Sequence, residues 1–279
     1  MKWQGRRQST NVEDRRGMGG KTLVGGGLGG IVLVLVVMLL GGNPSDVLNS
    51  LSTTSTDNSS VPYEESDQEK ELASFVSVVL ADTEDVWKKE FEEEGKEYKN
   101  PKLVLYNGTV QSACGTAGSS VGPFYCPGDQ KLYIDLSFYQ ELKNEFHAPG
   151  DFAMAYVIAH EVGHHVQNLL GTMDQGSRQN LSKTQANAQS VRVELQADYY
   201  AGVWAHEAQG MDLLEKGDVE EAIRAASAVG DDTLQKKAQG YVVPESFTHG
   251  TSEQRMRWFN KGLKNGTIEG GDTFHAKNL

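Results

Sequence analysis

The sequence has little positive charge, only two cysteines and no internal repeats. Its 279 residues include 26 Lys and Arg against 38 Asp and Glu, which gives a net charge of −12. Residues 1–22 carry six basic and two acidic side chains, a net charge of +4, so the remainder carries −16. Because phosphate binding needs a basic face, this acidic body is a poor candidate for binding nucleic acid. The length is sufficient for one or two domains with a substantial hydrophobic core.

Charge is absent altogether between Thr22 and Ser45. Residues 23–42 are long enough to cross a bilayer, which takes about 20 residues, although their glycine-rich first half is weakly apolar. Since the basic residues precede this stretch, we expect residues 1–22 to be a flexible cytoplasmic tail. The body should then lie outside, in the periplasm or the extracellular space.

A cleaved signal peptide is the competing interpretation of residues 23–42. Its apolar region would be about 7–15 residues long, and no A-x-A cleavage site follows here, so we favour a retained anchor in the inner membrane. The glycine pairs 25/29 and 26/30 have G-x-x-x-G spacing, which would allow anchors to associate into a homo-oligomer. Local softness near the membrane surface explains the same glycines equally well.

The rest of the chain divides into a linker and one domain. Residues 43–67 are rich in Ser, Thr, Asp and Asn, with too little apolar content to pack, and predict a disordered linker. The domain is expected over residues 68–279, with residues 266–279 frayed. Periodicity predicts helices over 68–94, from Ser137, and over 151–170, 177–209, 218–228, 234–239 and 252–263, with strands over 102–106 and 131–135. These elements indicate an α+β fold, a small sheet packed on several helices.

The most informative motif is His160-Glu161-Val162-Gly163-His164, inside an apolar stretch that favours a helix. On a helix, His160 and His164 lie one turn apart on one face, where both imidazoles can bind one metal ion. Glu161 projects about 100° around the helix, beside the metal rather than on it. Zinc lowers the pKa of a water molecule to about 7, and a carboxylate in that place can take its proton. An exposed, charged helix turn is the competing interpretation, but the apolar surroundings argue against it.

A catalytic zinc usually has three protein ligands and one open position. Glu194 and Asp198 lie four residues apart in the second long helix, so they face the same way. Glu194 would be the third ligand, and Asp198 would accept a hydrogen bond from a ligand histidine and fix its tautomer. Small residues at Ala197 and Ala201 would let the two helices approach closely. From spacing alone, a solvated acidic face is an equally good interpretation.

H-E-x-x-H followed by E-x-x-x-D resembles the pattern of gluzincin metallopeptidases. With residues 122–127, 160–167 and 194–202, the chain resembles a family of bacterial neutral zinc metallopeptidases over nearly its full length. The resemblance implies a zincin-like domain, bound Zn²⁺ and hydrolysis of peptide or protein substrates, without naming one. In gluzincin-like folds an edge strand beside the cleft pairs with an extended peptide. The strand near Phe124-Tyr125, or the one at Leu132-Tyr133-Ile134, is the candidate.

The resemblance further implies a second electrophile, a His, Tyr or Arg downstream of the third ligand. His249 fits by position and would stabilise the developing oxyanion. A surface histidine, or a structural brace bonded to Asp198, is the competing interpretation. If His249 does not serve, the second electrophile is to be sought among Tyr199, Tyr200 and Arg255.

The sequence therefore favours a membrane-anchored zinc endopeptidase with Glu161 as general base. The alternatives are a non-catalytic, zinc-dependent binding or scaffold protein of the envelope, and an amidase of cell-wall peptides. A glutamate next to a ligand favours an enzyme, because structural zinc sites tend to be closed by four protein ligands. Cys114 and Cys126 are expected to form a disulfide, since a body outside the cytoplasm is in an oxidising compartment.

Overall fold

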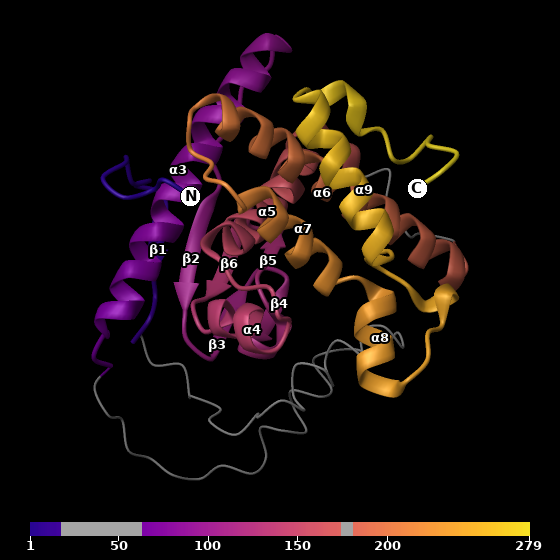
Figure 1. The fold of residues 1–279 in the computed structure, drawn as a ribbon, viewed down its shortest axis with the longest axis horizontal. Helices are drawn as coiled ribbons and strands as arrows, with labels where there is room; N and C mark the ends of the chain where they lie inside the picture. Colours follow the sequence, from indigo (N-terminus) through magenta and orange to yellow (C-terminus); the bar gives the residue numbers. More distant parts are fainter. Residues whose placement is uncertain (18–62, 174–180) are drawn as a thin grey trace.

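The computed structural model describes residues 1–17, 63–173 and 181–279. Its main elements are β1 (Val12–Asp14), α3 (Asp67–Glu93), β2 (Lys102–Tyr106), β3 (Thr109–Ser112), β4 (Gly115–Gly118), β5 (Phe124–Cys126), β6 (Lys131–Asp135), α4 (Phe138–Asn144), α5 (Asp151–Leu170), α6 (Lys183–Gly210), α7 (Asp218–Ala228), α8 (Asp231–Gln239) and α9 (Ser252–Asn265). The expected α+β class is confirmed (Figure 1).

The expected anchor at residues 23–42, its glycine pairs and residues 43–62 of the linker lie outside the described residues. Within the part of the chain that the structure describes, no helix has the length and apolar character needed to span a bilayer.

The central sheet has the strand order β1-β2-β6-β5. β1, β2 and β6 run parallel, and β5 pairs antiparallel with β6. Because side chains alternate along a strand, both faces of β2 are apolar: Leu103 and Leu105 join the main core, whereas Val104 and Tyr106 face a smaller one. The hairpin β3–β4 contributes Val110 to this second core. The sheet is thus buried on both faces.

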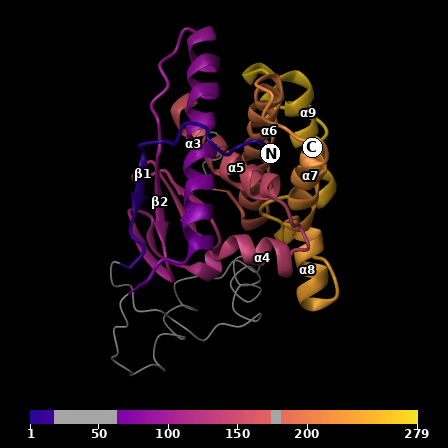
Figure 2. The same cartoon turned by 60° about the vertical axis from the view of Figure 1, so that its left-hand side comes forward.

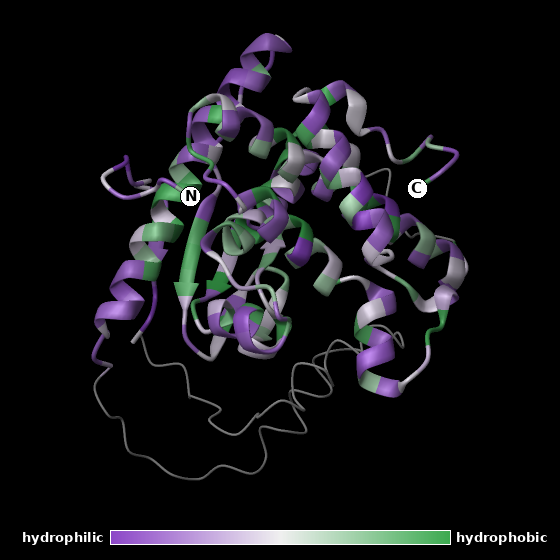
Figure 3. Ribbon diagram, viewed as in Figure 1, coloured by the Kyte–Doolittle hydropathy of each residue, from purple (hydrophilic) through white to green (hydrophobic). Residues whose placement is uncertain are grey.

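The main core lies between the sheet and the helices. Figure 2 shows β1 and β2 on one side, α3 and α5 in the middle, and α6, α7 and α9 on the other side. α5 contacts α6 and α7 as well as α3, so it is the central helix of the domain. Hydrophobic residues gather on β2 and on the inner helices, while the ends of α3 are hydrophilic (Figure 3). A helix buried on nearly all sides, such as α5, reads as an apolar run, which is why the sequence predicts it well.

Local signals fix where the long helices begin and end. Ser66 and Ser182 cap α3 and α6, each in a reciprocal capping box with the residue three positions later. Gly171 ends α5 in the left-handed conformation with a φ of 72°, which a glycine adopts without strain. The helix expected over 177–209 begins at Lys183 and ends at Gly210, and the Ser182 cap fixes its first turn.

The expectation of a separate, flexible N-terminal tail is wrong for residues 1–17. β1 lies in the sheet beside β2, and Met1 is buried in the main core. The α-amino group of Met1 lies 2.8 Å from Asp151 and 3.3 Å from Asp218. The tail prediction failed because the charged groups of residues 1–17 have partners distant in the sequence, such as Asp151 and Asp218 for the α-amino group.

The expectation that residues 266–279 are frayed is also wrong. Residues 268–271 form a short 3-10 turn, and Thr273 is fully buried. Gln196 on α6 donates a hydrogen bond of 2.8 Å to the carbonyl of Gly271, and Arg192 donates to that of Thr273. Two side chains of α6 thus hold the C-terminal segment.

The expected disulfide between Cys114 and Cys126 is present, and it ties the loop after β3 to the edge strand β5. We expect the double variant Cys114→Ala/Cys126→Ala to lose about 2–3 kcal/mol of unfolding free energy, because the unfolded chain regains the entropy of a loop of roughly a dozen residues. Urea denaturation of both proteins measures this loss. Two reactive thiols in the denatured, non-reduced parent protein would contradict the bridge.

Candidate metal centre

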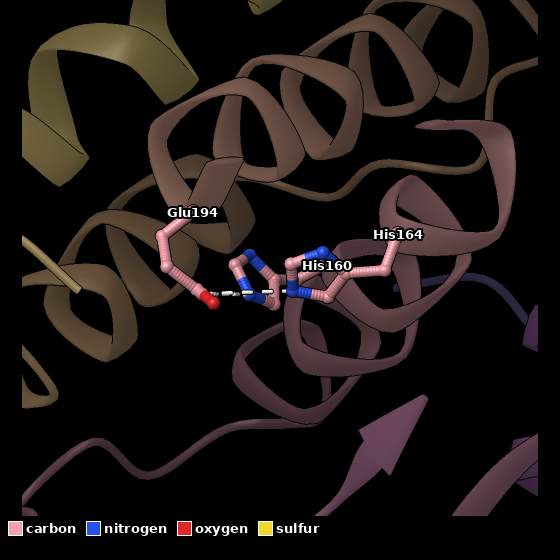
Figure 4. Close-up of side chains that lie close together, drawn as sticks. All are labelled: His160, His164 and Glu194. Atoms are coloured by element: carbon pink, nitrogen blue, oxygen red, sulfur yellow. Dashed lines mark hydrogen bonds and ion pairs between the residues drawn. The ribbon is translucent and has the colours of Figure 1, made fainter. Parts of the chain in front are cut away.

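α5 presents His160 and His164 on one face, one turn apart, as the H-E-x-x-H spacing predicts. Both rings meet the carboxylate of Glu194 from α6 (Figure 4). Nε2 of His160 lies 3.2 Å from Oε2 of Glu194, and Nε2 of His164 lies 3.5 Å from the same oxygen. One ligand atom from each residue lies within 4.8 Å of the others. Two imidazoles and one carboxylate fit the donor set of a catalytic zinc, which leaves a fourth position open.

The close approach of α5 and α6 depends on Gly163, inside the motif. A Cβ atom at Gly163 would lie only 2.9 Å from the carbonyl oxygen of Ala197. The backbones of α5 and α6 can therefore touch at this point. Glu194 lies about one turn before Ala197 on α6, so its side chain can reach the two histidines. The sequence points to the small Ala197, but the decisive small residue on the opposite helix is Gly163.

The second ring nitrogen of His160 has a buried carboxylate as its partner. Nδ1 lies 2.9 Å from Oδ1 of Asp198, which is fully buried. Arg255 from α9 donates two hydrogen bonds to Asp198, of 2.8 and 2.9 Å, and the Tyr156 hydroxyl donates another. These contacts fix the imidazole so that Nε2 faces the other two donors.

His164 is held by a residue that sequence reasoning missed. Its Nδ1 lies 2.8 Å from Oε1 of Gln167, and the Gln167 amide donates to the Val193 carbonyl (2.8 Å) and to Gln196 (3.0 Å). The spacing of three residues was a usable signal, because it places Gln167 on the same helix face as His164. Gln167 thus orients the second histidine and links α5 to α6.

Charge in the cluster favours a bound cation. Burial would lower the pKa of His160, but the charge of Asp198 and hydrogen bonds to Asp198 and Glu194 raise it to about 10. Burial would likewise raise the pKa of Glu194, yet the charges of His164 and His249 hold it well below its usual value. The neighbouring carboxylates therefore favour the protonated form of His160. A metal ion would replace that proton, so metal binding is expected to release it.

Glu161 lies beside the cluster and is not part of it. Only 8% of its surface is exposed, and burial raises the pKa of its carboxyl group. Its backbone follows that of His160 directly, so its side chain leaves the helix about 100° away. A carboxylate in this place can exchange a proton with a molecule bound at the open position.

His249 lies near Glu194, on the loop that leads into α9. The charge of Glu194 is the largest influence that raises the pKa of His249, against the opposing effect of burial. Asp231, at the start of α8, holds this loop. Its Oδ2 accepts hydrogen bonds from the backbone amides of Thr248 (2.7 Å), His249 (2.7 Å) and Gly250 (2.9 Å), and its Oδ1 lies 3.3 Å from Nδ1 of His249. Sequence reasoning missed Asp231, which lies 18 residues from its partner.

The other candidates for a second electrophile have different partners. Arg255 is bound to Asp198, and the Tyr199 hydroxyl donates to the carbonyl of Thr267 (2.7 Å). The Tyr200 ring packs edge-on against Trp87. The brace on Asp198 that we considered for His249 is formed by Arg255.

Comparisons with known proteins agree with this geometry. The profile of the family described as "Putative neutral zinc metallopeptidase" matches residues 1–274. The protein YpfJ of Escherichia coli, itself uncharacterised, is 49% identical over 98% of this chain and 99% of its own length. The uncharacterised protein Rv2575 of Mycobacterium tuberculosis is 44% identical over 65% of each chain. No solved structure matches the chain.

Proposed function

Because the chain belongs to the neutral zinc metallopeptidase family, we propose that it is a zinc-dependent endopeptidase. His160, His164 and Glu194 would hold Zn²⁺, the cofactor that the family implies. The observation that carries the proposal is the buried carboxylate of Glu161 beside a set of three donors. A non-catalytic zinc site is normally closed by a fourth protein ligand and has no use for this carboxylate.

Bound zinc would polarise the scissile carbonyl and lower the pKa of a water molecule. Glu161 would take the proton of the attacking water and pass it to the leaving amine. Asp198 and Gln167 keep the imidazoles oriented throughout, because each holds one Nδ1 atom. His249 would donate a hydrogen bond to the carbonyl oxygen as its negative charge develops.

The substrate would lie along β5. Among the strands that the structure describes, β5 pairs with β6 alone, and it is the sheet edge that contacts α5. The other candidate, at Leu132-Tyr133-Ile134, belongs to β6, which pairs on both sides and has no free edge. An extended peptide adding to β5 would be recognised through its backbone, and this mode of binding suits an endopeptidase.

The test is zinc content and peptide hydrolysis by the purified full chain. We expect casein or a peptide mixture to be cleaved, the activity to disappear with a chelator, and added zinc to restore it. Bound zinc with no hydrolysis of any peptide would support the scaffold alternative instead. Hydrolysis of cell-wall peptides alone would support the amidase.

Replacing the third donor should remove the metal. We expect Glu194→Ala to lose both zinc and activity, because two imidazoles alone hold zinc weakly and the uncompensated histidines repel a cation when protonated. Metal analysis after dialysis, beside the parent protein, measures this. The matched control is Glu253→Ala, an exposed glutamate on α9 that pairs with Arg257. Retention of zinc by Glu194→Ala would assign the third ligand elsewhere.

A further inference from the structure

The basic residues at the N-terminus are paired with acids, most of them distant in the sequence. Lys2 lies 2.9 Å from Asp212, and Arg6 lies 3.4 Å from Asp82. Arg7 pairs with both Glu84 (3.1 Å) and Asp85 (2.9 Å) of α3. The positive-inside rule concerns basic residues in segments that flank a membrane span. These residues are instead part of the folded domain.

The backbone of this segment is equally committed to the domain. β1 pairs with β2 in register, Val12 beside Leu103 and Asp14 beside Leu105. Backbone amides extend the contact on either side: that of Arg15 donates to Leu105 (2.8 Å), and that of Ser9 donates to Ser77 of α3 (2.9 Å). Removing residues 1–17 would leave the edge of β2 and part of α3 uncovered.

The two ends of the segment 18–62 emerge at one point of the domain. A Cβ atom at Gly17 would lie 2.9 Å from Cδ1 of Tyr63, so these residues are in contact. The side chain of Arg16 is 3% exposed and lies 2.7 Å from Glu65. A single membrane crossing between them would separate the two flanks by about 30 Å of hydrocarbon. That separation is incompatible with a contact between Gly17 and Tyr63.

The disulfide identifies the compartment of the same domain. Cys126 lies on β5, two strands away from β2 in the sheet that β1 completes. Disulfides persist outside the cytoplasm and are rare within it. Both the sheet and its N-terminal strand therefore belong to an oxidising compartment.

We propose that residues 1–17 lie on the same side of the inner membrane as residues 63–279, outside the cytoplasm. Residues 1–17 are then not a cytoplasmic tail on the opposite side of the membrane from the domain. This replaces the topology expected from charge and hydropathy alone. The proposal is independent of the catalytic assignment, because it rests on strand pairing and ion pairs away from the metal centre.

Single cysteines introduced into the full chain test this topology. Thr10 is exposed just before β1, and Lys88 is exposed on α3, so Thr10→Cys and its matched control Lys88→Cys each offer one thiol beside the bonded native pair. Whole bacterial cells expressing each variant are treated with a maleimide that does not cross the inner membrane. A lysed sample gives the maximum labelling. We expect both variants to be labelled in whole cells to the same extent.

Labelling of Lys88→Cys in whole cells, with Thr10→Cys labelled only after lysis, would overturn the proposal and restore a cytoplasmic tail. Labelling of both only after lysis would overturn the placement outside the cytoplasm. The parent protein reports folding in the same experiment, because its two cysteines stay unlabelled while the disulfide is intact. A non-reducing gel of each variant checks that the native bridge has formed.

Discussion

Glu161→Gln is expected to retain zinc and to lose most hydrolytic activity, with kcat lower by roughly 10²–10⁴-fold. Glutamine has nearly the same shape as glutamate, so the buried side chain should pack unchanged on α5. An amide cannot accept the proton of the attacking water, however, so the proton transfer fails. The three donors of the metal centre do not include Glu161, and the zinc content should stay at the parent level.

The matched control is Glu90→Gln, which alters another buried glutamate outside the metal centre. Glu90 lies on α3, and burial raises the pKa of its carboxyl group to about 7. This variant should keep the parent activity. Activity of Glu161→Gln equal to the parent would exclude Glu161 as the base, and loss of zinc from it would make Glu161 a ligand.

Elements defined by local patterns were predicted closely. The strands 102–106 and 131–135 and the helices 151–170 and 218–228 have the bounds that the sequence indicates. Each combines a clear apolar pattern with a local stop signal, such as Gly171 after α5. The pairing of His160 with His164 is likewise a property of one helix, so spacing alone predicts it.

What the sequence could not supply are contacts between distant segments. β1 is a strand of only three residues, and its partner β2 lies about 90 positions later, so no local period marks it. Asp231 looks like an ordinary polar surface residue until the fold places it against His249, 18 positions later. Charged side chains are buried only where the fold gives them partners. Residues 1–17 therefore resemble a free tail in the sequence, although Lys2 and Arg6 pair with acids of the folded domain.

His249→Ala is expected to lower kcat by roughly 10²–10³-fold with zinc content unchanged, since a preorganised donor to the oxyanion is a large catalytic contribution. The zinc should remain because His249 is outside the set of three donors. KM should change little, because the hydrogen bond forms mainly in the transition state. The matched control is His275→Ala, an exposed histidine that contacts Asp272 near the C-terminus.

The loop around His249 allows a second test of this prediction, through the residue that positions the histidine. Asp231 accepts hydrogen bonds from the backbone amides of three successive residues, and its carboxylate lies against Nδ1 of His249. It therefore determines where Nε2 of His249 points. Asp231→Asn should therefore lower kcat in the parent background but have little further effect on His249→Ala, because the positioning residue acts only through the histidine. Additive losses in the double variant would show that Asp231 supports the fold and not the donor. A parent rate for His249→Ala would remove His249 from the mechanism, because a donor to the oxyanion must contribute to the rate.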